Sequence, residues 1–259
     1  MDRGGRMGND TEAIETLAGW LAEARSAVAF TGAGISTESG IEDFRSPGGF
    51  WTRHQPVWFE DFVNDAAARR RFWRQRREMI PGMLAARPNA GHAALARLEA
   101  AGRLRGVITQ NIDELHQRAG SRSVLEVHGT AMKVHCLSCD KTWPSEEIQG
   151  RLEAGEEEFT CDECDGLLKS RTVSFGQTLP AAVMMEAMQW ARQCDLFIAM
   201  GSSLVVYPAA SIPEAAKRHR SRLVIINRDP TPMDGVADLV IHEPIGETMS
   251  AVMRAIDGQ

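Results

Sequence analysis

The feature that most constrains the fold of this chain is a glycine-containing turn directly after a short apolar run. The run Val28–Phe30 is typical of a buried parallel strand, and Gly32 and Gly34 follow it closely. Such glycines let the backbone turn tightly and bring its N–H groups against a pyrophosphate at the start of a helix. The third glycine of the dinucleotide-binding fingerprint is missing, and Thr37 stands in its place. The turn therefore indicates a dinucleotide site, although a tight turn without a ligand stays open on this motif alone.

The pattern of apolar runs predicts alternating strands and helices along the rest of the chain. Strands or extended segments are expected at 106–110, 123–128, 172–175, 195–200, 222–227 and 238–241, and helices at 112–119, 181–192, 208–220 and 246–256. This alternation predicts an α/β fold with a doubly wound parallel sheet of the Rossmann type. Ligands bind such sheets beyond the carboxyl ends of the strands. We therefore expect one crevice to be lined by the residues at those ends: Gly32, Gln110, His128, Gly201 and Asn227.

Four of the five cysteines form two closely spaced pairs. Cys136 and Cys139 make the first pair, Cys161 and Cys164 the second, and 21 residues lie between the pairs. Each pair can occupy two corners of a zinc tetrahedron, and four thiolates leave no open position for a reacting water. We therefore expect one structural Zn²⁺ in a smaller zinc-ribbon insert, with redox-active pairs as the rival interpretation. Cys194 is expected to be a small buried apolar side chain.

Composition restricts the class of protein further. The 259 residues are 43% hydrophobic, enough to bury a full core as one large domain or as one domain with a smaller insert. The excess of 35 acidic over 29 basic residues gives a net charge of −6, which argues against nucleic acid and anionic membranes as partners. The polar N-terminal segment lacks the apolar stretch of an export signal, and no run of about 18 apolar residues occurs. We expect a soluble, cytoplasmic protein.

Five short motifs follow one another along the chain. They are Phe30–Arg45, Thr109–His116, Val127–Gly129, Gly201–Ser203 and Asn227–Asp229. Together they resemble the motifs of the sirtuin family of bacterial type, the NAD-dependent protein deacylases, and the resemblance extends from about Gly19 to about Met253. It implies NAD as cosubstrate, an acyl-lysine protein or peptide as partner, and transfer of the acyl group, acetyl first of all, to ADP-ribose with release of nicotinamide. Mono-ADP-ribosyl transfer and non-catalytic NAD sensing stay open as alternatives.

The resemblance also implies roles for individual residues. His128 is the implied general base, which takes a proton from a ribose hydroxyl after the acyl oxygen attacks C1 of the nicotinamide ribose. Asn111 is implied to position that ribose, Gln110 to bond a ribose hydroxyl, and Asp113 to accept the nicotinamide amide N–H, whereas His116 is interpreted as a packing or hydrogen-bonding residue. The implied cofactor-binding residues are Gly32, Ala33, Gly34, Ser36, Thr37, Glu38, Asp43, Phe44, Arg45, Gln110, Asp113, Gly201, Ser202, Ser203, Asn227, Asp229 and Ile245.

Two extended segments, 173–176 and 203–206, are implied to pair with the backbone of the substrate peptide, although either could be an internal strand. The candidate substrate-binding residues within them are Val173, Phe175, Gly176, Leu204 and Val205. In sirtuins that prefer acidic acyl groups, a Tyr-x-x-Arg pair binds the acyl carboxylate, and Trp73 and Arg76 fall at those positions here. The missing phenol favours neutral acyl groups.

Two departures from the family pattern concern the loops. Glu42 replaces the usual proline before Asp43, which predicts a more mobile cofactor loop, and Gln177 replaces the usual glutamate after Gly176. The expected organisation is a Rossmann NAD-binding domain at 11–45, 86–130 and 171–259, a helical cofactor-loop module at 46–85 and a zinc-binding insert at 131–170. We expect a monomer.

Overall fold

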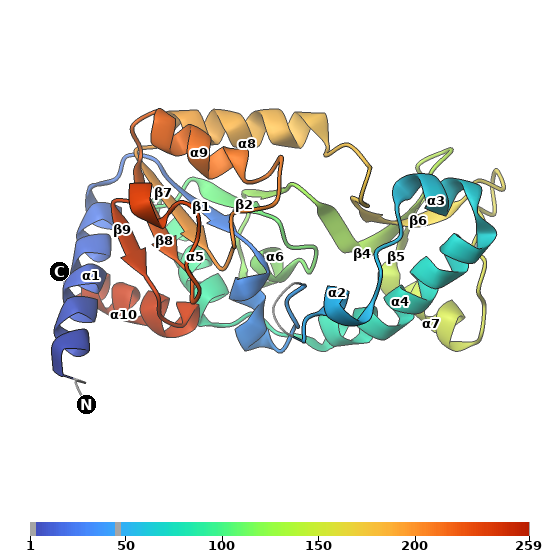
Figure 1. Ribbon diagram of the computed structural model, residues 1–259, viewed down its shortest axis with the longest axis horizontal. Coiled ribbons are helices and arrows are strands. Elements are labelled where there is room, and N and C mark those ends of the chain that lie inside the picture. Colours follow the sequence, from blue (N-terminus) through green and yellow to red (C-terminus); the bar gives the residue numbers. More distant parts are fainter. Residues whose placement is uncertain (1–3, 45–47, 259) are drawn as a thin grey trace.

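The computed structural model describes residues 4–44 and 48–258 and shows a larger and a smaller lobe (Figure 1). The larger lobe is built on a six-stranded sheet in which all neighbouring strands are parallel. Its order is β3 (Val124–Glu126), β2 (Gly106–Thr109), β1 (Ala27–Thr31), β7 (Leu196–Met200), β8 (Arg222–Ile226) and β9 (Leu239–Ile241). The strand order reverses between β1 and β7. The predicted α/β fold with a doubly wound parallel sheet is therefore confirmed.

Helices cover both faces of this sheet, which explains why its strands are continuous apolar runs. α1 (Gly4–Glu23), α5 (Ala90–Ala100) and α10 (Ile245–Asp257) lie on one face, and α8 (Ala181–Gln193) and α9 (Ser211–Arg218) lie on the other (Figure 1). In β1, Ala27 and Ala29 join the core beneath the first three helices, whereas Val28 and Phe30 join the core beneath the other two. Burial on both faces is typical of a parallel sheet.

The smaller lobe combines two segments that are far apart in the sequence. The segment between β1 and β2 forms α2 (Phe50–Arg53), α3 (Phe59–Asn64) and α4 (Ala66–Ala85). The segment after β3 forms the antiparallel strands β4 (Gly129–Cys136), β5 (Thr142–Pro144) and β6 (Leu168–Thr172), with α7 (Ser145–Glu153) between β5 and β6. One apolar cluster joins both segments through Phe62, Phe72, Trp73, Trp143, Ile148 and Phe159. The expected division into modules remains a prediction, since these two segments share a core.

The two strands that carry the chain into and out of the zinc segment are neighbours. Gly129 at the start of β4 pairs with Thr172 at the end of β6. Gly129 has φ +70°, and a Cβ there would lie 2.1 Å from the carbonyl oxygen of Arg171. Both the left-handed backbone and the close approach require glycine at this position.

Several predicted elements differ from the structure at their ends. The helix expected at 112–119 is α6 (Leu115–Ala119), because Glu114 has φ 55° and Asp113 accepts the N–H of Leu115. The helix expected at 208–220 is shorter, and no strand forms at 203–206, where Leu204 has φ 55°. Short 3₁₀ helices η1 (Ala33–Ser39) and η2 (Asp234–Val236) follow β1 and β8. Within the described ranges, no helix is long and apolar enough to cross a membrane.

Candidate active site and metal centre

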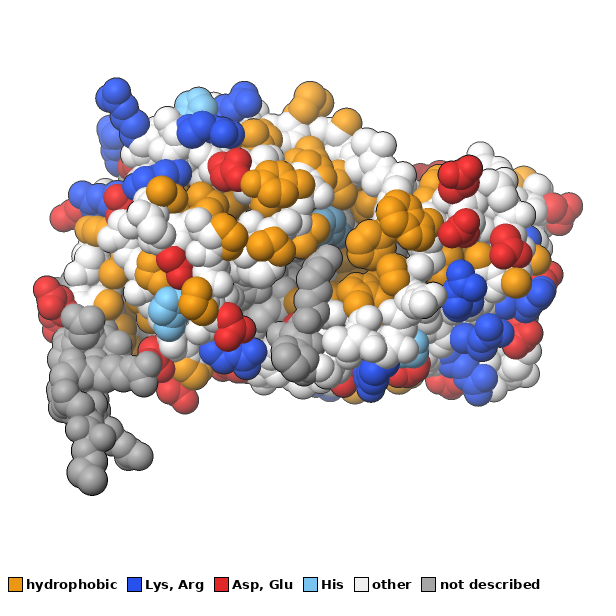
Figure 2. Space-filling view, viewed as in Figure 1, with side chains coloured by type: hydrophobic (Ala, Val, Ile, Leu, Met, Phe, Trp, Pro, Cys, Tyr) orange, Lys and Arg blue, Asp and Glu red, His pale blue; other side chains and the backbone are white. Residues whose placement is uncertain are grey.

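A cavity of about 770 Å³ opens between the two lobes at the carboxyl ends of the parallel strands. Figure 2 shows hydrophobic side chains gathered on both sides of the hollow in this face of the molecule. All the residues expected at the strand ends line the cavity: Gly32, Gln110, His128, Gly201 and Asn227. The structure thus brings together residues that are spread over almost 200 positions in the sequence.

The glycine turn after β1 packs directly against the turn after β7. The N–H of Gly32 donates to the carbonyl oxygen of Met200, and the N–H of Gly34 donates to the carbonyl oxygen of Gly201 at 2.8 Å. A Cβ on Gly34 would lie 2.7 Å from the Cα of Gly201, and one on Gly32 would lie 2.7 Å from its carbonyl oxygen. Gly32 itself has φ −127°, an ordinary extended value. These two glycines are therefore required by the close approach of two backbones rather than by a left-handed conformation.

A buried hydrogen-bond network lies behind the middle of the cavity. The hydroxyl of Ser36 donates to Asp113 at 2.7 Å, and the side-chain amide of Asn111 donates to the Ser36 oxygen at 3.0 Å. All three side chains are buried. Burial raises the pKa of Asp113, while the hydrogen bonds from the Leu115 N–H and from Ser36 oppose that rise. The network fixes the orientation of the Asn111 side chain at the cavity wall.

His128 is held in one tautomer by the backbone directly after β2. Its Nδ1 lies 2.9 Å from the carbonyl oxygen of Gln110. Because a carbonyl only accepts hydrogen bonds, Nδ1 carries the proton and Nε2 is the basic nitrogen of the neutral ring. The carbonyl oxygen of His128 accepts the N–H of Val173, so the backbone is anchored as well. This arrangement suits a general base facing the cavity.

The other predicted residues fall into groups by position. Those that line the cavity, beyond the residues already described, are Ala33, Thr37, Glu38, Asp43, Phe44, Asn111, Val173, Phe175, Gly176, Ser202, Ser203, Asp229 and Ile245. Ser36 and Asp113 lie in the network behind the wall. Leu204 is buried elsewhere and Val205 is exposed, and neither lines the cavity. Arg45 lies outside the described residues.

Helix α4 contributes a cavity face of which the sequence predicted only Arg76. Phe72, Gln75, Arg76 and Met79 line the cavity from this helix. Their i, i+3, i+4 and i+7 spacing was a readable signal for one helical face. Trp73 points instead into the core of the smaller lobe, with its ring centroid 4.7 Å from that of Phe159.

Arg76 is the member of the expected acyl-binding pair that does line the cavity, and its guanidinium is already engaged. It donates to the hydroxyl of Ser170 and to the carbonyl oxygen of Ala131. Burial lowers the pKa of Arg76 to about 9.

An ion pair spans the loop that carries the Glu42 departure. A carboxylate oxygen of Glu42 lies 2.5 Å from a guanidinium nitrogen of Arg53, and both side chains are about half exposed. Backbone hydrogen bonds from Phe50 to Asp43 and from Trp51 to Phe44 tie the same loop to α2. These contacts join residues 42–44 to α2, at the place where the proline is absent.

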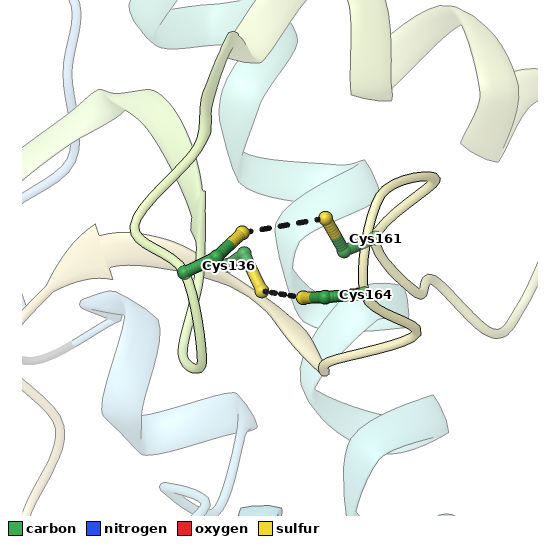
Figure 3. Close-up of side chains that lie close together, drawn as sticks. Cys136, Cys161 and Cys164 are labelled. Atoms are coloured by element: carbon green, nitrogen blue, oxygen red, sulfur yellow. Dashed lines mark hydrogen bonds between the residues drawn. The ribbon is translucent and has the colours of Figure 1, made fainter.

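The two cysteine pairs form one cluster. The four Sγ atoms of Cys136, Cys139, Cys161 and Cys164 lie within 4.8 Å of one another, and Figure 3 shows side chains from two loops pointing together. Two sulfur–sulfur separations join the pairs, 3.5 Å from Cys136 to Cys164 and 3.6 Å from Cys139 to Cys161.

The cluster has the dimensions and donors of a zinc site. A tetrahedron with Zn–S bonds of about 2.3 Å has sulfur–sulfur edges of about 3.8 Å, close to these separations. Backbone N–H groups of Ser138 and Glu163 donate to two of the sulfurs, as expected for stabilised thiolates. The four cysteines therefore fit one structural Zn²⁺ with closed coordination.

The fold and site together define a class of protein in which a Rossmann-type sheet and a zinc-bearing lobe enclose a dinucleotide cavity. The chain belongs to the Sir2 family, whose family model matches residues 32–208. NAD-dependent protein deacetylase 1 of Bradyrhizobium diazoefficiens is 50% identical over 238 residues, which cover 91% of this chain and 93% of that protein.

Solved structures of the same family are similar in fold. One described as Sir2 with a p53 peptide and NAD⁺ gives a TM-score of 0.87 at 39% identity, over 95% of this chain and 99% of the other. Another is described as Sir2 with deacetylated p53 peptide and 3′-O-acetyl ADP ribose. It gives a TM-score of 0.87 at 39% identity, over 93% of this chain and 97% of the other.

Proposed function

We propose that the chain is an NAD-dependent protein-lysine deacylase, with deacetylation as its main reaction. The observation that carries this proposal is His128, whose Nδ1 is bonded to a carbonyl so that its basic Nε2 serves the cavity built at the strand ends. Relatives named as deacetylases and structures described with NAD⁺ and an acetylated peptide support the same activity.

Each residue of the site has a task in this reaction. Bound NAD supplies a ribose carbon that can accept the acyl oxygen while nicotinamide leaves. Asn111, fixed by Ser36, holds the ribose, and Asp113 behind the cavity wall accepts the Ser36 hydroxyl and so holds that serine in place. His128 takes a proton from a ribose hydroxyl at Nε2. Phe44 and Trp51, which stack at 5.9 Å on the cavity wall, keep water from competing with the acyl oxygen.

The metal has a structural task. Four thiolates complete the coordination of Zn²⁺, so no position remains for a reacting water. The four cysteines would hold the ion between the end of β4 and the loop before β6, which would stabilise the smaller lobe, whose helix α4 lines the cavity.

The substrate is an acyl-lysine in an extended peptide that lies beside residues 173–176 and 203–206. Residues 173–176 line the cavity together with Ser203 and Val206, and Phe175 is held in place by its bridge to Trp58 and by accepting the N–H of Phe59. The acyl group is neutral, because Trp73 is buried away from the cavity and Arg76 is bonded to Ser170 and Ala131. The protein acts as a monomer in the cytoplasm.

Mass spectrometry of the purified protein with NAD and acetyl-, succinyl- and long-chain-acyl-lysine peptides tests the proposal. We expect loss of the acetyl group, O-acyl-ADP-ribose as coproduct, and no turnover by His128→Ala. His219→Ala is the matched control, because His219 lies at the end of α9 and is absent from the cavity lining. A modified protein in place of a free lysine would instead identify ADP-ribosyl transfer, and preference for the succinyl peptide would refute the neutral acyl pocket.

A further inference from the structure

Two buried histidines lie behind the catalytic network and have no role in the reaction described above. His92 in α5 is 0% exposed and His116 in α6 is 1% exposed, with ring centroids 4.8 Å apart. Among the described residues, Nε2 of His92 and Nδ1 of His116 have no hydrogen-bond partner. Such buried ring nitrogens are costly unless they satisfy each other directly or through one water.

The N-terminus of α5 determines the tautomer of His92. The backbone N–H of Asn89 donates to Nδ1 of His92 at 3.3 Å, within a capping box that also uses the Asn89 side chain. Since Nδ1 accepts, the neutral ring carries its proton on Nε2. His92 therefore offers a donor to the contact with His116, and the Nδ1 lone pair of His116 is the complementary acceptor.

Hydrogen bonds donated in the same direction continue from His116 toward the active site. With Nδ1 as acceptor, His116 carries its proton on Nε2, which lies 2.9 Å from the hydroxyl of Thr31. The Thr31 hydroxyl donates to that of Thr109 at 2.8 Å, and the Thr109 oxygen also accepts the backbone N–H of Asn111 at 3.0 Å. Hydrogen bonds thus connect His116 to the backbone of Asn111, and the ring contact between His116 and His92 joins them to the cap of α5.

We propose that His92 and His116 are positioning residues, a pair of neutral imidazoles that hold Asn111 in place through Thr31 and Thr109. Burial lowers the pKa of His92 to about 4, and burial together with the neighbouring His92 lowers the pKa of His116 to about 3. Both rings therefore stay neutral near pH 7. The catalytic part of this inference rests on the proposed role of Asn111, whereas the tautomers do not.

Nitrogen-15 NMR of the full-length, zinc-loaded protein labelled in histidine tests the tautomers directly. We expect both His92 and His116 to carry the proton on Nε2 and to show no titration between pH 8 and pH 5, with His92→Gln and His116→Gln used for assignment. An Nδ1-protonated ring at either position, or a titration of either ring in that range, would overturn the proposal. This outcome is independent of whether the protein removes acyl groups.

Steady-state kinetics test the positioning role. We expect His116→Phe to lower kcat about tenfold with little change in KM for the acyl peptide, and His116→Gln, which keeps a donor near Nε2, to recover most of that loss. Thr31→Val interrupts the same series of hydrogen bonds without changing side-chain volume greatly. It replaces His116→Phe as the test variant if His116→Phe does not fold. His219→Gln is the control. Unchanged kcat in both His116→Phe and Thr31→Val would refute the role, whereas an inactive wild-type protein would refute the proposed function instead.

Discussion

Replacing Gly34 by alanine should separate the two turns that form the dinucleotide end of the cavity. The new Cβ would lie 2.7 Å from the Cα of Gly201 and 2.9 Å from its carbonyl oxygen, whereas ordinary contacts begin at 3.4 Å. One backbone must therefore move by roughly 0.7 Å, and overpacking of this kind costs about 1–3 kcal/mol. At about 2–4 °C per kcal/mol for a domain of this size, we expect Tm to fall by about 2–12 °C. Because the displaced turns line the cavity, NAD should bind about tenfold more weakly.

Gly19→Ala provides the matched control. Gly19 lies inside α1, and a Cβ there would meet no heavy atom within 4 Å. Alanine in a helix interior is favoured over glycine by about 0.5–1 kcal/mol, so the same substitution should raise Tm slightly at this position. Differential scanning calorimetry and titration calorimetry with NAD measure both effects. If Gly34→Ala matched Gly19→Ala in Tm and NAD affinity, the reasoning from backbone contact would be wrong.

Three further predictions concern the metal, a loop and pH. Removing zinc with a chelator, or Cys139→Ser, should lower the thermal stability of the smaller lobe and abolish deacylation, and activity that survives complete metal loss by elemental analysis would contradict a structural zinc. Arg53→Ala should raise KM for NAD two- to threefold, as expected for an exposed ion pair worth about 0.2–1 kcal/mol, while the exposed Arg74→Ala should not. The pKa of His92 is about 4 in the folded state, below its unfolded value of 6.5, so the unfolded chain binds more protons between these two pH values. The free energy of unfolding therefore falls as pH drops from 6.5 toward 4, by roughly 3 kcal/mol from this residue. Urea unfolding at pH 7, 6 and 5 should show a shallower loss in His92→Gln, and identical slopes would exclude His92 as the cause.

The sheet and the strand-end residues could be predicted because both follow from local patterns. Runs such as Leu196–Met200 are apolar throughout since both faces of the strand are buried, and the rule for parallel sheets then places Gly32, Gly201 and Asn227 at one edge. The cysteine spacing likewise predicted the cluster that the structure contains. In each case a short segment carries its own signal.

The contacts missed by sequence reasoning depend on residues that are distant along the chain. The sequence near Ser36 does not predict its hydrogen bond to Asp113, and the sequence near Trp73 does not predict its ring contact with Phe159. Both pairs come into contact only when two distant segments fold together. The extended segment at 203–206 was implied by the family resemblance, and the structure differs there for another reason. Leu204 has a left-handed backbone conformation that turns the chain, and leucine is not a residue type in which that conformation is expected.

The pairing of Gly129 with Thr172 brings the two ends of residues 130–171 together, and the segment between them packs against α4 in a shared apolar cluster. Its insertion leaves the order of the six parallel strands unchanged. Residues 130–171 can therefore vary in length and in exposed surface, during evolution or by design. The register of the sheet and the glycine turns against Gly201 need not change. Recognition of different protein substrates can therefore diversify on one side of the cavity while the dinucleotide side is left unaltered.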